Sequence, residues 1–185
     1  TPIASTRLFA ETLLNRKELS EEKKQSSLEK IIQEQDRLQQ LVDKILLASS
    51  IGESDQKISY KPIAIKEFVN NIIDANSYYN NIENNISETL VLDLDDFFFT
   101  SVIQNLLDNA RKYSSSEDLI IVESEIDSSQ LLISFLDKGI GVPEKEKSKI
   151  FEQFYRIEDE DTRSFKGTGL GLYLVNEIVK MHGAK

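Results

Sequence analysis

Two closely spaced glycine pairs constrain this chain more than any other feature of its sequence. They lie in residues 137–141, Asp-Lys-Gly-Ile-Gly, and in residues 167–171, Gly-Thr-Gly-Leu-Gly, where a third glycine follows the pair. Because glycine lacks a Cβ, such loops turn sharply and let backbone N–H groups approach a ligand closely. The second pair leads into an apolar pattern with helical spacing, formed by Leu172, Val175, Ile178 and Val179.

A glycine-rich loop that leads into a helix N-terminus points unpaired N–H groups and the positive end of the helix dipole at an anion. The two stretches therefore predict a phosphate site, with the charged segment between them as a lid. The alternative for either pair alone is a glycine turn before an ordinary core helix.

Composition restricts which ligands and partners such a site can have. The 185 residues are 39% hydrophobic and 29% charged, which suits one good core with an extension, or two small domains. The formal net charge of −10 disfavours nucleic acid as a partner, so a nucleotide ligand needs local donors and a metal cation. No apolar run reaches about eighteen residues, which predicts no membrane segment in this sequence. The absence of cysteine excludes disulfides and thiolate metal sites.

The first fifty residues carry helical patterns that leave an apolar stripe uncovered. Residues 1–17 are loosely helical, and a second helix is predicted over 20–48, with a stripe of Leu28, Ile31, Ile32, Leu38, Leu41, Val42, Ile45 and Leu46. A lone hairpin of this size buries too little surface to be stable, so we expect a homodimeric four-helix bundle. The alternative is one long core helix of a single domain. Residues 51–56 are interpreted as a linker, which divides the chain into domains 1–56 and 57–185.

The second domain mixes strand and helix patterns. Strands are predicted at 59–62, 90–93, 119–126 and 131–136, helices at 65–79 and 96–113, and an asparagine-rich loop at 80–85. In the helix over 96–113, the side chains of Asn105, Asn109 and Lys112 share one stripe beside the apolar face. An asparagine oxygen suits Mg²⁺, and a lysine ammonium suits a phosphate. The alternative is a helix whose polar side faces water.

Further polar groups stand near the glycine pairs. Asp137 ends a predicted strand, where its carboxylate can accept a hydrogen bond from an exocyclic amine, and Gly139 and Gly141 leave room for a flat ring. We expect the aromatic residues of 151–155 to fasten the base of the lid. Arg156, Arg163 and Lys166 are then placed to reach phosphates from above.

These motifs, in this order, resemble the catalytic core of two-component sensor histidine kinases. Residues 105–113 look like that family's N box, residues 137–141 its first glycine box, residues 151–156 its F box and residues 167–172 its second glycine box. The match covers about residues 57–183. The preceding hairpin looks like the family's dimerisation and histidine-phosphotransfer domain.

The resemblance implies an α+β chain in which a helical hairpin, forming a dimeric four-helix bundle, precedes an α/β sandwich ATP-binding domain of the gyrase and histidine-kinase type. It implies ATP and Mg²⁺ as cofactors, with Asp137 binding adenine and Asn109 holding Mg²⁺ with Asn105 nearby. Arg156 and Asn105 are assigned to catalysis, Arg156 by stabilising charge on the transferring γ-phosphoryl group. The remaining nucleotide-binding positions are Lys112, Tyr113, Gly139, Gly141, Gly167, Thr168, Gly169, Leu170 and Gly171.

The implied activity is transfer of the γ-phosphoryl of ATP to a histidine and onward to a response-regulator aspartate, by the cytoplasmic part of a membrane-bound bacterial sensor. One alternative is a non-catalytic nucleotide-binding dimerisation module. Simple hydrolysis is another, because DNA gyrase B and mismatch-repair ATPases share the nucleotide fold. Those relatives carry a glutamate base where this chain has Asn105, an amide that cannot accept a proton from water.

The sequence departs from the family at both ends. The phosphoacceptor pattern His-Glu-x-x-Thr-Pro would place the histidine four residues before Thr1, so we expect the acceptor to be missing and the chain to be a fragment. Thr1 matches the threonine that assists dephosphorylation of the response regulator. His182 is expected to have a structural role at a helix C-terminus, with Gly183 as the C′ residue. The family would also continue past Lys185 into further strands.

Overall fold

The computed structural model describes residues 2–16, 18–51, 58–127, 130–157 and 167–184. The chain divides into two compact units, Thr1–Ser50 and Ile51–Lys185. The predicted domain boundary between residues 56 and 57 lies outside the described residues, so it stays a prediction.

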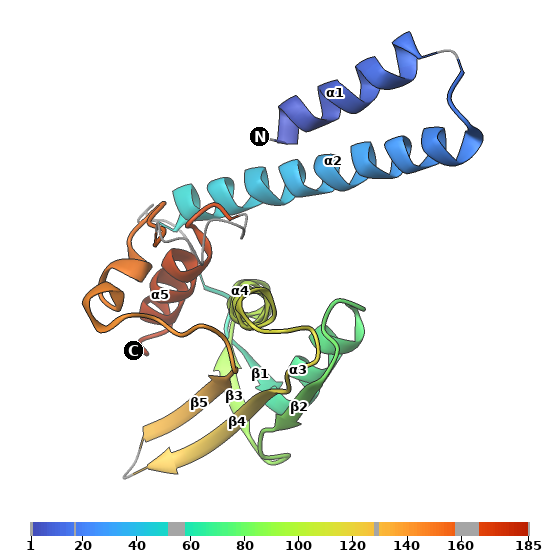
Figure 1. Cartoon of the computed structure of the whole chain (residues 1–185). Coiled ribbons are helices and arrows are strands. Elements are labelled where there is room, and N and C mark those ends of the chain that lie inside the picture. The colour runs from blue at the N-terminus through green and yellow to red at the C-terminus, as the bar shows by residue number, and fades with distance from the viewer. Residues whose placement is uncertain (1, 17, 52–57, 128–129, 158–166, 185) are drawn as a thin grey trace. The chain divides into compact units, whose positions relative to one another are not determined.

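The first unit is a helical hairpin, as predicted. Helix α1 spans Pro2–Asn15 and helix α2 spans Glu21–Ser50, and they run antiparallel (Figure 1). Ser20 precedes α2, and its hydroxyl accepts a hydrogen bond from the backbone N–H of Lys23 at 3.4 Å. Glu21 and Glu22 occupy the first turn, where carboxylates favourably meet the helix dipole.

The hairpin has almost no buried core of its own. Among its described residues only Ala48 is buried. Large apolar side chains remain exposed along both helices, namely Ile3, Leu8, Leu14, Leu28, Ile32, Val42, Ile45 and Leu46. Because exposed apolar stripes of this length are costly in water, this unit requires a further surface to cover them.

In its described residues, the second unit combines two small sheets with three α-helices. The strands are β1 (Lys61–Ala64), β2 (Ile82–Asn85), β3 (Val91–Leu94), β4 (Ile120–Asp127) and β5 (Gln130–Leu136). Strands β1 and β3 pair antiparallel, and the larger sheet has the order β2-β4-β5, with β2 parallel and β5 antiparallel to β4. The helices are α3 (Ile65–Asp74), α4 (Asp96–Tyr113) and α5 (Gly171–Met181), with 3₁₀ turns η1 (Glu144–Glu146) and η2 (Lys149–Phe151).

The core of this unit lies between the helices and the sheet. Helices α4 and α5 lie on the same side of β4 and β5 (Figure 1). The most deeply buried side chains come from α3, α4, α5 and β4 and include Ile65, Val69, Ile103, Leu107, Ile120, Val122, Leu174 and Ile178. Helix α4 has the bounds that the sequence predicts, and the helical hairpin followed by an α/β domain agrees with the predicted fold class.

The prediction of a loop over residues 80–85 is wrong. Residues 82–85 form β2, in which Ile82 is paired with Ile120 of β4. Asparagine is unfavourable in strands, but here pairing with a buried neighbour supplies the hydrogen bonds. The Asn84 side chain also donates to the carbonyl of Lys66 at 3.0 Å and to Oδ1 of Asn70 at 2.8 Å, which ties the strand to α3.

Helix α3 ends five residues earlier than predicted, at Asp74 rather than Tyr79. Tyr79 is buried outside the helix, and its hydroxyl donates to Oδ1 of Asp108 on α4 at 2.7 Å. Burial, followed by this hydrogen bond, raises the pKa of the Tyr79 phenol above its usual value. Tyr79 is therefore a buried residue, but it packs on α4 and does not extend α3.

No helix in the described ranges combines the length and apolar character needed to cross a bilayer.

Candidate functional site

Helix α4 presents the N-box side chains and is anchored at its first turn by Asp95. The Asp95 carboxylate accepts hydrogen bonds through Oδ1 from the backbone N–H groups of Phe97 and Phe98, at 3.1 and 3.3 Å. Its Oδ2 accepts from the N–H of Ser59 at 2.8 Å. One side chain thus caps the helix and holds the segment before β1.

The two N-box asparagines have different surroundings. Asn105 is 3% exposed, and its amide nitrogen donates to the carbonyl and the hydroxyl of Ser101 at 2.8 and 3.2 Å. Asn109, one turn further along, is half-buried, and its side chain makes no hydrogen bond to the described residues. Asn109 is therefore the more available of the two oxygen donors, whereas Asn105 is built into the packing.

The second glycine box lies directly over this helix face. A Cβ placed on Gly171, the first residue of α5, would lie 3.0 Å from Oδ1 of Asn105. A Cβ on Gly167 would lie 2.7 Å from Nζ of Lys112. The two motifs are thus in contact, and glycine at both positions gives the N-box polar groups the space they occupy.

Lys112 and Tyr113 form a pair at the end of α4. The Lys112 ammonium donates to the Tyr113 hydroxyl at 3.0 Å and lies 4.5 Å from the centre of the Tyr113 ring. This arrangement fixes a positive charge beside Gly167.

The first glycine box meets the same end of α4 at Tyr113. The N–H of Gly139 donates to Oδ1 of Asp137 at 2.7 Å, and a Cβ on Gly139 would lie 2.7 Å from the carbonyl oxygen of Tyr113. Oδ2 of Asp137 has no partner in the described ranges and remains available as an acceptor. Gly141 has φ +70°, a left-handed conformation that favours glycine, and the space around it is open.

The F box contacts the second glycine box. The N–H of Phe154 donates to the carbonyl of Gly169 at 3.1 Å, and both residues have left-handed backbones, with φ +64° and φ +73°. A Cβ on Gly169 would lie within 2.7 Å of the Phe154 and Tyr155 backbone, so only glycine fits there. Tyr155 donates a hydrogen bond to Glu146, which raises the pKa of the phenol and lowers the pKa of the carboxyl.

The remaining predicted residues are only partly described. Leu170 is fully buried, and its N–H donates to Oγ1 of Thr168 at 3.3 Å. Arg156 is exposed at the base of the predicted lid. Arg163, Lys166 and Thr1 lie outside the described residues.

This arrangement brings together groups suited to a phosphorylated, amine-bearing ligand. The start of α5 offers N–H groups and the positive end of a helix dipole, Lys112 offers an ammonium, and Asp137 offers a carboxylate acceptor. The described residues contain no cluster of three or more His, Cys, Asp or Glu side chains suited to a metal ion.

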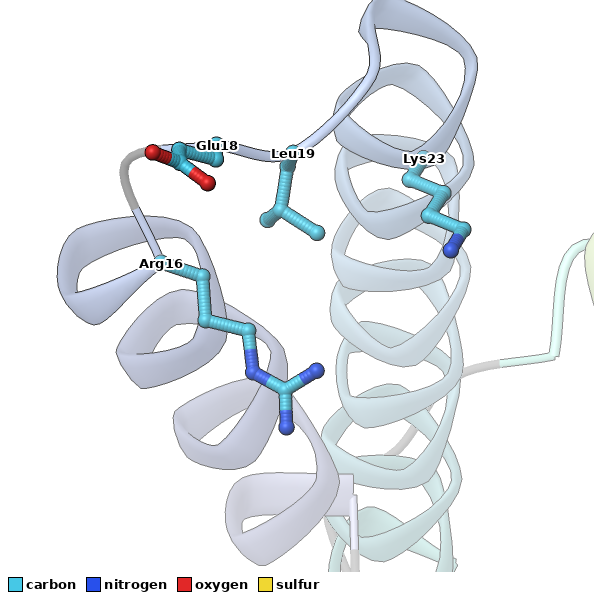
Figure 2. Close-up of a pocket in the computed structure, with 4 residues that line it drawn as sticks. All are labelled: Arg16, Glu18, Leu19 and Lys23. Carbon is cyan, nitrogen blue, oxygen red and sulfur yellow. The ribbon is translucent and has the colours of Figure 1, made fainter.

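The hairpin unit has a pocket of its own, which contains no residue of the four motifs. It is lined by Arg16, Glu18, Leu19 and Lys23 where α1 turns into α2, with Leu19 pointing between the two cationic side chains (Figure 2).

Two structural residues were missed by sequence reasoning. Asp95 could have been found, because an aspartate directly before an apolar helical run is a capping signal. Arg111, 4% exposed inside the N box, could not, because a charged residue near a helix end normally faces solvent.

Comparison with known proteins finds family models that match both units of the chain. Residues 1–54 match the family described as "His Kinase A (phospho-acceptor) domain", and residues 94–185 match "Histidine kinase-, DNA gyrase B-, and HSP90-like ATPase". Sensor histidine kinase WalK of Bacillus subtilis is 32% identical over 157 residues, covering 81% of this chain and 26% of WalK. Sensor protein RprX of Bacteroides fragilis is 32% identical over 154 residues, covering 79% of this chain and 30% of RprX. The chain thus spans less than a third of the length of these curated relatives.

Solved structures show the same fold. Acinetobacter baumannii histidine kinase AdeS matches with a TM-score of 0.71 at 21% identity, over 97% of this chain and 84% of the AdeS chain. The mycobacterial sensor histidine kinase MprB matches with a TM-score of 0.57 at 27% identity, over 68% of this chain and 81% of that chain. With both family domains in the expected order and sensor kinases as relatives, the chain belongs to the two-component sensor histidine kinases.

Proposed function

We propose that this chain binds ATP with Mg²⁺ between the N box and the two glycine boxes and transfers the γ-phosphoryl group to a histidine, from which a response-regulator aspartate receives it. The observation that carries the proposal is the contact between motifs distant in sequence. Gly167 and Gly171 lie against Lys112 and Asn105, while Gly139 lies against the carbonyl of Tyr113. The end of α4 is thus bordered by both glycine boxes.

The adenine side is supplied by Asp137. Its Oδ1 is engaged by the N–H of Gly139, so the carboxylate is held in place while Oδ2 can accept a hydrogen bond from the exocyclic amine. The open space at Gly141 accommodates a flat ring. Tyr113, whose carbonyl borders Gly139, completes this side of the proposed site.

The phosphate side is supplied by the start of α5 and by Lys112. Gly167, Thr168, Gly169, Leu170 and Gly171 lead into that helix, whose first N–H groups have no intrahelical partners. Asn109 provides the oxygen that fits Mg²⁺, and Asn105 stands behind it as a buried neighbour. When bound, Mg²⁺ neutralises phosphate charge.

Arg156 completes the proposed catalytic set. It is exposed at the base of the segment between the F box and the second glycine box, where a guanidinium can reach charge that develops on the transferring phosphoryl group. Positioning and electrostatics carry most of this chemistry, so no general base is required from the N box.

The acceptor is a histidine other than His182. Both ring nitrogens of His182 are engaged in the fold, Nε2 by the backbone N–H of Asp95 at 3.2 Å and Nδ1 by the carbonyl of Ile178 at 2.8 Å. His182 is the one histidine of the 185 residues. A nucleophilic imidazole needs a free nitrogen lone pair, which His182 lacks.

The exposed apolar stripe of the hairpin supports a homodimer, because a second copy would cover Leu28, Ile32 and Leu46 in a four-helix bundle.

A receiver domain of a response regulator is the onward partner, and Thr1 is proposed to assist its dephosphorylation. Since the relatives are sensor proteins, we place the core in the cytoplasm as part of a membrane-bound bacterial sensor.

A non-catalytic nucleotide-binding dimerisation module is the second candidate, favoured by the absence of a free histidine in the 185 residues. Simple hydrolysis is disfavoured, because Asn105 is an amide whose nitrogen is hydrogen-bonded to Ser101.

The deciding experiment incubates the chain with γ-labelled ATP, Mg²⁺ and a supplied hairpin that carries the phosphoacceptor histidine. Acid-labile label on that hairpin supports the kinase. Nucleotide binding without any transfer supports the module, and steady phosphate release without the hairpin supports hydrolysis.

A further inference from the structure

Arg111 is a buried cation beside the proposed nucleotide site to which none of the roles above is assigned. It lies in the last turn of α4 and is 4% exposed. Within the described ranges it has no ion pair with a carboxylate. Burying a guanidinium is costly unless its N–H groups are hydrogen-bonded, so its partners indicate what it stabilises.

All of its partners are backbone carbonyls from two loops. Nη1 donates to the carbonyls of Ser115, Ser116 and Asp118 at 3.1, 3.3 and 3.2 Å, and Nη2 donates to the carbonyl of Asn80. The first three belong to the loop that follows α4, and Asn80 lies just before β2. Arg111 therefore joins the end of α4 to both segments at once.

Other hydrogen bonds hold the same two loops together. The side chain of Asn81 donates to the carbonyl of Ser116 at 3.4 Å, and the N–H of Ile120 donates to the carbonyl of Asn81 at 3.0 Å. The N–H of Ser115 donates to Oδ2 of Asp118 at 2.8 Å. These loops have their own supports, so loss of Arg111 loosens the joint to α4 without removing every contact.

The position of this joint connects it to the nucleotide. The loop that Arg111 holds begins immediately after Tyr113, whose carbonyl oxygen would lie 2.7 Å from a Cβ on Gly139. A shift of the loop moves that carbonyl and the first glycine box that packs on it. Lys112 and Asn109 lie on the same final turns of α4.

We propose that Arg111 is a positioning residue for nucleotide binding: by holding the loop after α4 to Asn80, it fixes the Tyr113 and Gly139 wall of the site. The proposal rests on the proposed function, since it concerns the same ATP site. Arginine is required because a planar guanidinium donates in several directions at once, whereas a lysine ammonium at the end of a flexible chain cannot reach four carbonyls.

The test is calorimetric titration of the full chain with Mg·ADP and with the non-hydrolysable analogue Mg·AMPPNP. Arg111→Lys keeps the charge, and Arg111→Met keeps most of the volume without any donor. Asp95→Ala is the matched control, because it removes buried hydrogen bonds from the opposite end of the same helix. Thermal unfolding of each variant without nucleotide measures the structural cost.

We expect both Arg111 variants to bind about tenfold more weakly than wild type, a factor that corresponds to losing charge-assisted hydrogen bonds. The factor should be equal for the two nucleotides, because the wall is on the adenine side. Asp95→Ala should lower the unfolding temperature comparably and leave both affinities within about twofold of wild type. If Arg111→Met fails to fold, Arg111→Lys carries the test.

Amide hydrogen exchange without nucleotide tests whether Arg111 holds the two loops, separately from its effect on nucleotide affinity. In Arg111→Lys, exchange should accelerate at residues 80–82 and 115–119 and stay unchanged in α5. The positioning role alone would be overturned if wild type binds nucleotide and Arg111→Lys binds it equally tightly. It would also be overturned if hydrogen exchange in both loops is the same in Arg111→Lys as in wild type. Failure of wild type to bind either nucleotide would overturn the proposed function and the positioning role with it.

Discussion

The backbone N–H of Asp95 donates to Nε2 of His182 at 3.2 Å, joining residues 87 positions apart in the sequence. Nδ1 of His182 faces the carbonyl of Ile178 at 2.8 Å, so the tautomer that satisfies both contacts carries a hydrogen on Nδ1. The ring also makes edge contacts with Tyr60 and Phe99. The histidine thus fastens the end of α5 to the start of α4.

Replacing His182 with phenylalanine keeps the aromatic contacts and removes both hydrogen bonds. We expect the free energy of unfolding, measured with urea, to fall by about 1–2 kcal/mol, because the Asp95 N–H loses its partner in a buried region. Phosphoryl transfer to a supplied histidine hairpin should remain at the wild-type level. A variant that loses transfer while staying folded would show that His182 has a chemical role.

Helix α4 has the bounds predicted from the sequence, because its apolar period is uninterrupted. Strand β2 was missed, since Asn84 and Asn85 disfavour strands locally and only pairing with β4 defines them as one. Arg111 was missed for a related reason. Its burial exists only after the following loop and Asn80 have folded around it.

The four motifs of the candidate site could be predicted from the sequence, but the contacts between residues of different motifs could not. Spacing along α4 places Asn105, Asn109 and Lys112 on one face, which follows from helix geometry. That Gly167 meets Lys112, and that Asn105 is buried whereas Asn109 is only half-buried, depends on how α5 packs on α4. Tertiary packing of this kind leaves no local signal in the sequence.

Two glycines of the second box should respond differently to alanine. At Gly169, with φ +73°, a Cβ would lie within 2.7 Å of backbone atoms of the F box, so Gly169→Ala should lower both thermal stability and nucleotide affinity. At Gly167 the obstacle is the flexible ammonium of Lys112, so Gly167→Ala should reduce affinity with little loss of stability. Thermal unfolding and nucleotide titration of both variants test this. Equal stability losses would contradict it.

The Tyr155–Glu146 hydrogen bond makes part of the stability depend on pH. It lowers the pKa of Glu146 below the usual 4.5, so its stabilising contribution is present above that value and is lost as the pH falls through the folded pKa. Urea unfolding of wild type and Tyr155→Phe should therefore differ near neutral pH, and the difference should shrink on acidification below about pH 4.5. A difference that stays constant would contradict the assignment. Because the folded Tyr155 has a raised pKa, its own contribution is present below pH 10 and is lost only above it.

The exposed stripe of the hairpin predicts self-association. Ile32→Glu places a charge on it, and the adjacent Gln33→Glu adds the same charge at an exposed position that is already polar. We expect sedimentation to show a dimer for wild type and Gln33→Glu and a monomer for Ile32→Glu, because an unpaired buried carboxylate is costly. A dimer that persists in Ile32→Glu would place the dimer contact elsewhere.

The most direct test of a single ATP site at the end of α4 is calorimetric titration with Mg·ATP of wild type, Asn109→Ala and Asp137→Ala, with the exposed Glu125→Ala as control. Asn109 and Asp137 come from different motifs, and the proposed site has each of them contribute a polar contact to one ligand. We expect wild type and the control to bind alike and each site variant to bind at least about tenfold more weakly. Wild-type affinity in both Asn109→Ala and Asp137→Ala would contradict the proposed site.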